Sequence, residues 1–469
     1  MDIHLDLSAI RNVYFLGIGG IGMSALARWF KRQGYWVGGY DLTPTPLTTQ
    51  LQSEDIPVHF TDDTGLIPEH ILAERTTTLV IYTPAIPKNH QEYQFLKKEG
   101  FTIYKRAQVL GKITEGYFTV AIGGTHGKTS TTAMLSHIFK SAQKNCTAFI
   151  GGIVKNYDSN LIAGNGADQI IVTEADEFDR SFLNLHPNIC IVTSVDADHL
   201  DIYGQTQEVI EAYASFVRQC SPQGTALLQT KVMTQLSDTL SQNGMHLMSY
   251  GLQEGDYHAA HVYFQVTDAL PCFIFDLIHP EGIIKEMQLY APGFHNVENA
   301  IAAAAAALQV GIAPETIQKA LTTYQGVKRR FDYMLTQPVI FIDDYAHHPT
   351  EIHALLQSVK AIYPDKKITV IFQPHLYSRT RDFVEGFAQS LSLANELLLL
   401  PIYPARELPI EGISSEIIHE KVNTNSTLCA KENLLDHLAK RELEVLLTVG
   451  AGDIDQMVIP VRDFLRSTL

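Results

Sequence analysis

Short apolar runs recur along this chain, separated by longer segments in which apolar positions follow a helical spacing. Short runs of this kind are typical of buried strands, and the helical segments between them are typical of crossover connections in parallel sheets. The sequence therefore predicts an α/β protein with mainly parallel sheets. The predicted strands are 12–16, 35–40, 78–83, 102–104, 170–173, 189–194, 339–342, 368–372, 397–400 and 445–449.

The first predicted strand runs into a glycine-rich turn that precedes a predicted helix over 25–33. The glycines have the G-x-G-x-x-G spacing, and the second strand ends at an acidic residue, Asp41. A single motif of this kind is weak, because it also serves tight packing of a helix on a strand. Its strand–turn–helix–strand context favours a Rossmann-like domain that binds a diphosphate. The candidate ligand contacts are Gly17, Gly19, Gly20, Ile21, Gly22, Met23, Ser24 and Asp41.

A second glycine-rich turn follows the apolar run Val120–Ile122 and precedes another helical pattern. Backbone N–H groups of such a turn and of a helix N-terminus can surround a phosphate, while Lys128 supplies a positive charge and Thr129 offers a hydroxyl to Mg²⁺. The loop is one residue shorter than the usual phosphate loop, and a bare flexible turn is the alternative. The predicted nucleotide contacts are Gly124, Thr125, His126, Gly127, Lys128, Thr129 and Ser130.

Acidic residues follow the next two predicted strands, at the edge where the phosphate loop should also lie. Glu174-Ala175-Asp176-Glu177 comes after the strand at 170–173, and His199 stands among aspartates after the strand at 189–194. Hard oxygen ligands suit Mg²⁺, and a histidine beside carboxylates can join a metal site or assist proton transfer. The pattern predicts a metal site, although a solvated acidic loop and a packing histidine are the alternatives.

Polar clusters also follow two strands near the end of the chain. One contains Asp343 and Asp344, and the other contains His375, Arg379 and Arg381. The arginines can clamp a carboxylate or stabilise a phosphoryl group in transfer. The blocks around these clusters and the two glycine-rich turns suggest three domains, at 1–110, 111–326 and 327–469.

Composition narrows the class of protein further. The chain has 469 residues, 45% of them hydrophobic, and a formal net charge of −16, which argues against a general nucleic-acid or anionic-membrane surface. No apolar run reaches the roughly 20 residues of a membrane span. The five cysteines lie far apart without metal-ligand spacing, so we expect buried free thiols. The first residues lack the layout of a signal peptide, and we expect a cytoplasmic protein.

Taken together, the motifs resemble the Mur ligases along essentially the whole chain. The segments that carry the resemblance are Gly-Thr-His-Gly-Lys-Thr at 124–129, Glu-Ala-Asp-Glu at 174–177, Asp-His-Leu-Asp-x-Tyr-Gly at 198–204, Gly-x-His-Asn-x-x-Asn-Ala at 293–300, Arg-Arg-Phe at 329–331 and Asp-Asp-Tyr-Ala-His-His-Pro-Thr-Glu at 343–351. The resemblance implies a Rossmann-like N-terminal domain for a UDP-sugar, a central phosphate-loop ATPase domain and a Rossmann-like C-terminal domain for an amino acid. The implied chemistry is ATP-dependent ligation of L-alanine to the lactyl carboxylate of UDP-N-acetylmuramate through an acyl phosphate, a step of peptidoglycan synthesis.

The resemblance also implies roles for individual residues. Lys128 would hold the β- and γ-phosphates of ATP, Thr129 and Glu174 a first Mg²⁺, and Glu174 and His199 a second one. The adenine and ribose would lie near His295, Asn296 and Asn299. Across the domain gap, Arg330 and Asp344 would reach ATP. His375 and Arg379 would approach the alanine carboxylate or the phosphate. The glycine-rich turn with Asp41 would hold the UDP-sugar.

One departure and several alternatives stay open at this point. Many family members carry Arg where this chain has Leu376, so amino-acid selectivity is in doubt, and Arg379, Arg381 or Arg406 would have to compensate. The nearest rival is a ligase that recycles murein tripeptide onto UDP-N-acetylmuramate. A nicotinamide-dependent oxidoreductase or a non-catalytic nucleotide switch would each leave part of the motif set unused. For the assembly, we expect a monomer or a weak homodimer.

Overall fold

The computed structural model describes residues 5–166, 168–196, 203, 205–240, 244–267, 269–405 and 407–468. The chain divides into two compact units, described here one at a time. Unit 1 comprises residues 1–250 and 302–317, and unit 2 comprises residues 251–301 and 318–469. The predicted boundaries at 110/111 and 326/327 stay predictions.

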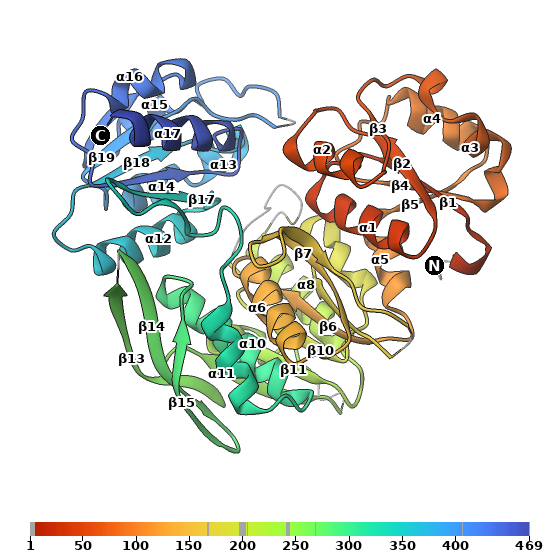
Figure 1. Ribbon diagram of the computed structural model, residues 1–469, viewed down its shortest axis with the longest axis horizontal. Helices are drawn as coiled ribbons and strands as arrows, with labels where there is room; N and C mark the ends of the chain where they lie inside the picture. The colour runs from red at the N-terminus through yellow and green to blue at the C-terminus, as the bar shows by residue number, and fades with distance from the viewer. Residues whose placement is uncertain are drawn as a thin grey trace. The chain divides into compact units, whose positions relative to one another are not determined.

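The N-terminal part of unit 1 is a five-stranded parallel sheet in the order β3-β2-β1-β4-β5 (Figure 1). Its helices connect successive strands, as parallel pairing requires. The elements are β1 (Asn12–Leu16), α1 (Ile21–Arg32), β2 (Trp36–Tyr40), α2 (Pro46–Ser53), β3 (Val58–His59), α3 (Glu69–Ala73), β4 (Thr78–Tyr82), α4 (Gln91–Lys98), β5 (Thr102–Lys105) and α5 (Arg106–Thr114).

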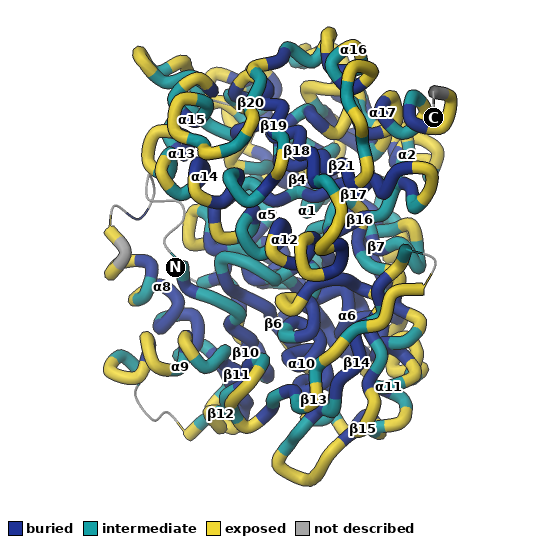
Figure 2. Tube along the Cα trace, turned by 90° about the vertical axis from the view of Figure 1, so that its left-hand side faces the viewer, coloured by how far each residue is buried: buried dark blue, intermediate teal, exposed yellow. Residues whose placement is uncertain are grey.

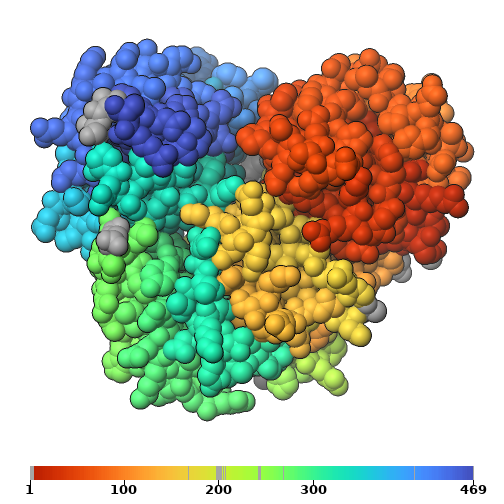
Figure 3. Space-filling model, viewed as in Figure 1, coloured from red at the N-terminus to blue at the C-terminus, as the bar shows by residue number. Residues whose placement is uncertain are grey.

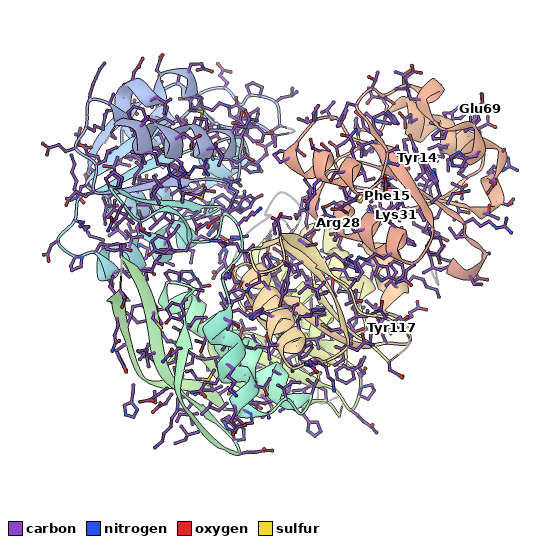
Figure 4. All side chains as sticks on the ribbon, viewed as in Figure 1. Tyr14, Phe15, Arg28, Lys31, Glu69 and Tyr117 are labelled. Carbon is purple, nitrogen blue, oxygen red and sulfur yellow. The ribbon has the colours of Figure 1, made fainter. Side chains whose placement is uncertain are left out.

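Both faces of this sheet are covered, which explains why β1 is buried at every position and is apolar from Val13 to Leu16 rather than alternating. Phe15 packs into a core with residues of α1 and α5, whereas its neighbour Tyr14 belongs to a separate core with residues of α3 and α4. Tyr14 and Phe15 are labelled in Figure 4. The order and the two-sided cover are those of a Rossmann-like domain.

The central part of unit 1 is a second sheet, whose strands follow the order β12-β11-β10-β6-β9-β7-β8. All neighbours pair in parallel except β7 and β8, which form an antiparallel hairpin. Figure 2 shows β6 and β10 as buried tube. The elements are β6 (Phe118–Gly123), α6 (Lys128–Ser141), β7 (Cys146–Val154), β8 (Ser159–Ile162), β9 (Ile170–Glu174), β10 (Ile189–Val192), α8 (Thr206–Arg218), β11 (Thr225–Gln229), α9 (Thr230–Leu236) and β12 (His246–Gly251).

Unit 2 begins with three antiparallel strands, β13 (Tyr257–Thr267), β14 (Leu270–His279) and β15 (Gly282–Leu289). Their side chains form the green surface in the space-filling view (Figure 3). Helix α10 (Phe294–Gln309), with the alanine-rich run inside it, starts in unit 2 and ends in unit 1. Helix α11 (Pro314–Thr323) starts in unit 1 and ends in unit 2.

The C-terminal sheet of unit 2 has the order β16-β17-β21-β18-β19-β20, parallel except for β16. Its helices fill the connections, which again gives a Rossmann-like layout. The elements are β16 (Asp332–Leu335), β17 (Ile340–Asp344), α12 (Pro349–Ile362), β18 (Ile368–Phe372), α13 (Tyr377–Asp382), α14 (Val384–Leu391), β19 (Glu396–Leu399), α15 (Glu416–His419), β20 (Asn425–Leu428), α16 (Leu434–Leu438), β21 (Val445–Val449) and α17 (Asp455–Thr468).

The predicted α/β class and the mainly parallel sheets are confirmed. The predicted strands are present, with ends shifted by one or two residues at several of them. Helix α1 begins at Ile21 rather than at residue 25, because Gly20 is its N-cap and the last glycine of the turn already lies in the first helical turn. Within the described residues, no helix is long and apolar enough to cross a membrane.

Candidate active site

The glycine-rich turn after β1 is held in place by the end of β2. The N–H groups of Gly17 and Ile18 both donate to the Tyr40 carbonyl, at 2.8 and 2.9 Å, and Gly19 N–H donates to the Asp41 carboxylate at 2.7 Å. Gly17 has φ +87°, and a Cβ there would lie 2.5 Å from Thr83, so this position requires glycine. Asp41 thus shapes the turn in the structure, which places it beside the predicted diphosphate contacts.

The phosphate loop between β6 and α6 is shaped by the end of β10. His126 N–H donates to the Ser194 hydroxyl at 2.9 Å, and Thr125 Oγ1 donates to the Asp196 carbonyl at 3.0 Å. Gly124 has φ +131°, and a Cβ there would lie 2.0 Å from Thr193 Oγ1. Gly127, with φ 82°, is the N-cap of α6, so the helix N-terminus opens directly onto the loop. The positive end of the helix dipole then favours an anion at this position.

Lys128 lies in the first turn of α6 with its ammonium directed back over the loop. Its Nζ donates to the Gly124 carbonyl at 2.5 Å and to the two carboxylate oxygens of Glu177 at 2.7 and 2.9 Å. Burial disfavours the charged ammonium, but the attraction of Glu177 outweighs it and raises the pKa of Lys128 above its ordinary value. The ammonium is therefore charged at neutral pH and lies among the groups that would surround a phosphate.

Thr129 and Glu174 bring two hard oxygen donors together beside that lysine. Thr129 Oγ1 donates to Glu174 Oε2 at 3.1 Å, and the other carboxylate oxygen accepts from Gly151 N–H at 2.5 Å. Glu174 reaches this position because β9 pairs in parallel with β6, opposite Ile122. A hydroxyl and a carboxylate next to a phosphate-binding loop fit Mg²⁺, which prefers oxygen ligands. The third predicted metal ligand, His199, lies outside the described residues.

The C-terminal sheet gathers a second set of predicted residues at the carboxyl ends of its strands. Asp344 ends β17, and its two oxygens accept from the N–H groups of Phe331 and Ala346, both at 2.7 Å. Burial raises the pKa of Asp344 to about 6, although Arg330 acts in the opposite direction. Arg330 lies with its guanidinium carbon 5.0 Å from the centre of the Tyr345 ring. The predicted pair of Arg330 and Asp344 thus lies in one neighbourhood.

Histidines connect this neighbourhood to the end of β18. Glu351 is 4.0 Å from Arg330 and accepts the N–H of His347 at 3.0 Å. The ring of His347 lies 6.0 Å from that of His375, and His375 Nδ1 lies 3.4 Å from a guanidinium nitrogen of Arg379. A continuous row of charged and imidazole groups therefore crosses this edge of the sheet, where open α/β sheets bind ligands.

Leu376 has an unusual backbone conformation, with φ 71°. Its N–H donates to the Tyr403 carbonyl at 2.9 Å, and its carbonyl accepts from the Thr380 hydroxyl at 2.8 Å. A left-handed conformation is unfavourable for a branched side chain, so these bonds fix a turn that the residue does not favour by itself. The turn directs Arg379, which is buried, towards His375.

The predicted adenine-side residues all lie at the start of α10. Asn296 and Asn299 are buried, and Asn299 Nδ2 donates to Asn296 Oδ1 at 3.2 Å. Asn296 Nδ2 also donates to the Pro292 carbonyl at 2.6 Å, whereas His295 is exposed. The two amides therefore stabilise the first turn of the helix.

Sequence reasoning missed several residues of these neighbourhoods. Glu177 pairs with Lys128, Arg106 donates to Asp176 at 2.9 Å, and Glu351 connects Arg330 to His347. Glu177 and Glu351 lie inside motifs that the sequence displays, so their place in those motifs was a usable signal. Arg106 has none, because its contact joins segments 70 residues apart.

Comparison with known proteins identifies the family. Three family models match in chain order: Mur ligase family, catalytic domain, over residues 12–118; Mur ligase middle domain over 122–307; and Mur ligase, glutamate ligase domain, over 329–452. The chain belongs to the Mur ligase family, as the motifs predicted.

Individual relatives cover the chain almost completely. A UDP-N-acetylmuramate–L-alanine ligase of Christiangramia forsetii is 46% identical over 463 residues, which cover 98% of this chain and 99% of that protein. The crystal structure of UDP-N-acetylmuramate–alanine ligase from Thermotoga maritima has a TM-score of 0.80 at 29% identity, covering 98% of this chain and 100% of the other. A murein peptide ligase from Psychrobacter arcticus has a TM-score of 0.70 at 21% identity, covering 98% and 99%, which shows a shared fold.

Proposed function

We propose that this protein ligates L-alanine to the lactyl carboxylate of UDP-N-acetylmuramate, with ATP converted to ADP and phosphate, in peptidoglycan precursor synthesis. The observation that carries the proposal is the 46% identity, over nearly the full chain, to a UDP-N-acetylmuramate–L-alanine ligase. The phosphate loop supports it, because Thr129 of that loop lies against the carboxylate of Glu174. The family is ATP-dependent, and the phosphate loop of unit 1 accounts for that requirement.

ATP would bind with its β- and γ-phosphates at the N-terminus of α6. The Lys128 ammonium lies over the loop and the N-terminus of α6 opens onto it, so positive charge is already in place before the substrate arrives. Phosphoryl transfer depends mainly on such positioning and neutralisation of charge. The UDP-sugar would bind at the turn Gly17–Ser24, with Asp41 holding the turn in shape. These residue roles are part of the proposal.

Thr129 and Glu174 would hold Mg²⁺, with His199 as a further ligand. When bound, the ion neutralises charge on the phosphate oxygens. The chain's own contribution is to fix the carboxylate: Gly151 N–H and Thr129 Oγ1 each donate to one of its two oxygens.

The proposed reaction has two balanced steps. A lactyl carboxylate oxygen attacks the γ-phosphorus, the bond to the β-phosphate oxygen breaks, and ADP leaves. The amine of alanine then attacks the acyl carbon, loses a proton and expels phosphate. Arg330 and Asp344 are proposed for the ATP side of the site, together with His295, Asn296 and Asn299. His375 and Arg379 are proposed to hold the alanine carboxylate or the phosphate being transferred, because an arginine that contacts a histidine presents several donors in a fixed geometry.

The test is release of phosphate from ATP with different acceptors. We expect release with UDP-N-acetylmuramate and L-alanine together, and not with either alone. Release with murein tripeptide, but not with L-alanine, would replace the proposal by the recycling ligase. Comparison of L-alanine, L-serine and glycine then measures the selectivity that Leu376 puts in question. We further propose that the enzyme works in the cytoplasm, where ATP is made. We also propose that it is a monomer or a weak homodimer, and static light scattering at several protein concentrations would distinguish the two.

A further inference from the structure

The β7–β8 hairpin of unit 1 contacts both predicted ligand sites of that unit. It belongs to the central sheet, yet its side chains reach α1, whose first turn continues the glycine-rich turn Gly17–Gly22. Of its residues, only Gly151 has been given a role so far, as a donor to the Glu174 carboxylate. Its contacts fall into two groups, one at Asn160 and the other at Gly151.

Asn160, on β8, is fully buried and uses both ends of its amide on α1. Its Nδ2 donates to the Ile21 carbonyl at 2.6 Å and to the Ser24 hydroxyl at 2.9 Å, while its Oδ1 accepts from Arg28 Nη1 at 2.5 Å. Ile21 and Ser24 belong to the predicted UDP-sugar contacts. One side chain of the central sheet therefore holds the first turn of the helix that should face the diphosphate.

Arg28 completes this contact from the helix side (Figure 4 labels it). Its guanidinium is 6% exposed, and its Nε and Nη2 donate to the carboxylate of Glu54, at the end of α2, at 2.8 to 3.1 Å. The charge of Arg28 is thereby compensated, and its third donor group is aimed at Asn160. A buried guanidinium with paired donors has little freedom to reorient, so the contact is rigid.

The second group of contacts joins the hairpin to Glu174. Gly151, on β7, donates its N–H to Glu174 Oε1, and a Cβ at this position would lie 2.5 Å from Oε2. In the same hairpin, Phe149 of β7 packs against Trp29 of α1 with ring centres 6.5 Å apart. A single hairpin thus contacts the proposed metal-holding carboxylate and the proposed sugar-nucleotide turn.

We propose that Asn160 is a positioning residue for the ligation, and that it sets the distance between the UDP-sugar turn and the ATP end of unit 1. The inference rests on the proposed function, because only a reaction between the two ligands needs that distance fixed. Each ligand still meets its own turn when Asn160 is lost. What changes is how the lactyl carboxylate meets the γ-phosphate, and a misplacement of about 1 Å can cost on the order of 10²-fold in rate.

The test compares Asn160→Leu with the unmodified full-length protein. Leucine has a similar size but offers no donor to Ile21 and Ser24 and no acceptor to Arg28. We expect UDP-N-acetylmuramate and ATP each to bind alone within about threefold of the unmodified protein, while kcat for phosphate release falls by about tenfold or more. A residue with only a structural role would instead lower the folded fraction and leave kcat per folded molecule unchanged.

A matched control and a milder variant make the result decisive. Gln50, on α2, donates to the Asp158 carbonyl of the same hairpin at 3.4 Å, but on the surface, so Gln50→Ala should leave kcat unchanged. Arg28→Lys keeps the charge and loses the donor to Asn160, and should lower kcat in the same direction if Asn160→Leu does not fold. A kcat within about twofold of the unmodified protein, or an equal loss in Gln50→Ala, overturns the inference. Absence of alanine-dependent turnover in the unmodified protein would instead refute the proposed function.

Discussion

The contact between Gly151 and Glu174 predicts that one added methyl group will damage catalysis without damaging the fold. In Gly151→Ala, the new Cβ would lie 2.5 Å from Glu174 Oε2 and 2.8 Å from Oε1. The only groups that obstruct it at those distances belong to a movable carboxylate, so the side chain of Glu174 has to retreat by roughly 1 Å to reach ordinary van der Waals contact. It then no longer lies where Thr129 and Gly151 hold it.

The magnitudes for activity and stability differ. Displacement of this size at a reacting centre costs on the order of 10²-fold in kcat. The free energy of unfolding should change by only about 1 kcal/mol or less, because alanine in a strand is at least as favourable as glycine. The assays are ATP turnover with UDP-N-acetylmuramate and L-alanine, calorimetric binding of ADP with Mg²⁺, and denaturant unfolding of the same preparations.

A double-mutant cycle identifies the cause. If Gly151→Ala acts through the carboxylate, then adding it to Glu174→Ala should change Mg²⁺-dependent ADP affinity no further, because the obstructed group is already absent. Additive losses in the two variants would refute the reasoning, and so would a Gly151→Ala protein with full activity. A large loss of stability in Gly151→Ala would also contradict it, since the obstruction would then involve groups that cannot move.

Three further predictions concern other parts of the molecule. Lys128→Ala should abolish turnover while UDP-N-acetylmuramate still binds, measured by calorimetry on the folded variant; loss of that binding would contradict the separation of the two sites. Burial raises the pKa of Glu92 from 4.5 to about 7, although the hydrogen bond from Tyr14 acts in the opposite direction. The folded protein therefore favours the protonated carboxyl, so the contribution of Glu92 to the free energy of unfolding is full below about pH 4.5 and is lost as the pH rises through about 7. Glu92→Gln should therefore flatten the fall of unfolding free energy across that range by at most about 3 kcal/mol, and an unchanged slope would show that the carboxyl is not the titrating group. Arg379→Ala should raise KM for L-alanine more than KM for ATP, and an equal rise in both would argue against its place beside His375.

The sequence predicted the parallel sheets well because their strands are apolar at nearly every position. β1 and β18, for example, are buried along their whole length, and such runs between helical patterns have few other interpretations. The antiparallel strands β13 to β15 were not predicted. Their outer faces are partly exposed, as at Tyr263 and Ile283, so apolar and polar residues mix there without a clean alternation.

Site residues that directly follow strands could be predicted for the same physical reason. Lys128, Glu174 and Asp344 come within a few residues of a predicted strand end, and the carboxyl ends of parallel strands meet at one edge. Asn160 could not be found in this way. It lies in a short edge strand, and its importance comes from its contacts with α1. One of these partners, Arg28, is 132 residues away in the sequence, and no local pattern encodes such a contact.

The buried polar contacts of the β7–β8 hairpin join the central sheet of unit 1 to the helix that follows β1 in its N-terminal sheet. Asn160 and Arg28 are polar groups in an apolar boundary, and an apolar pair of similar shape would avoid the cost of desolvating them. Hydrogen bonds have a stricter geometry than apolar packing, so they fix how far α1 may slide along the hairpin. Under the proposed function, a carboxylate at one turn has to meet a phosphate at the other, and the reaction then needs that restriction more than the protein needs additional stability.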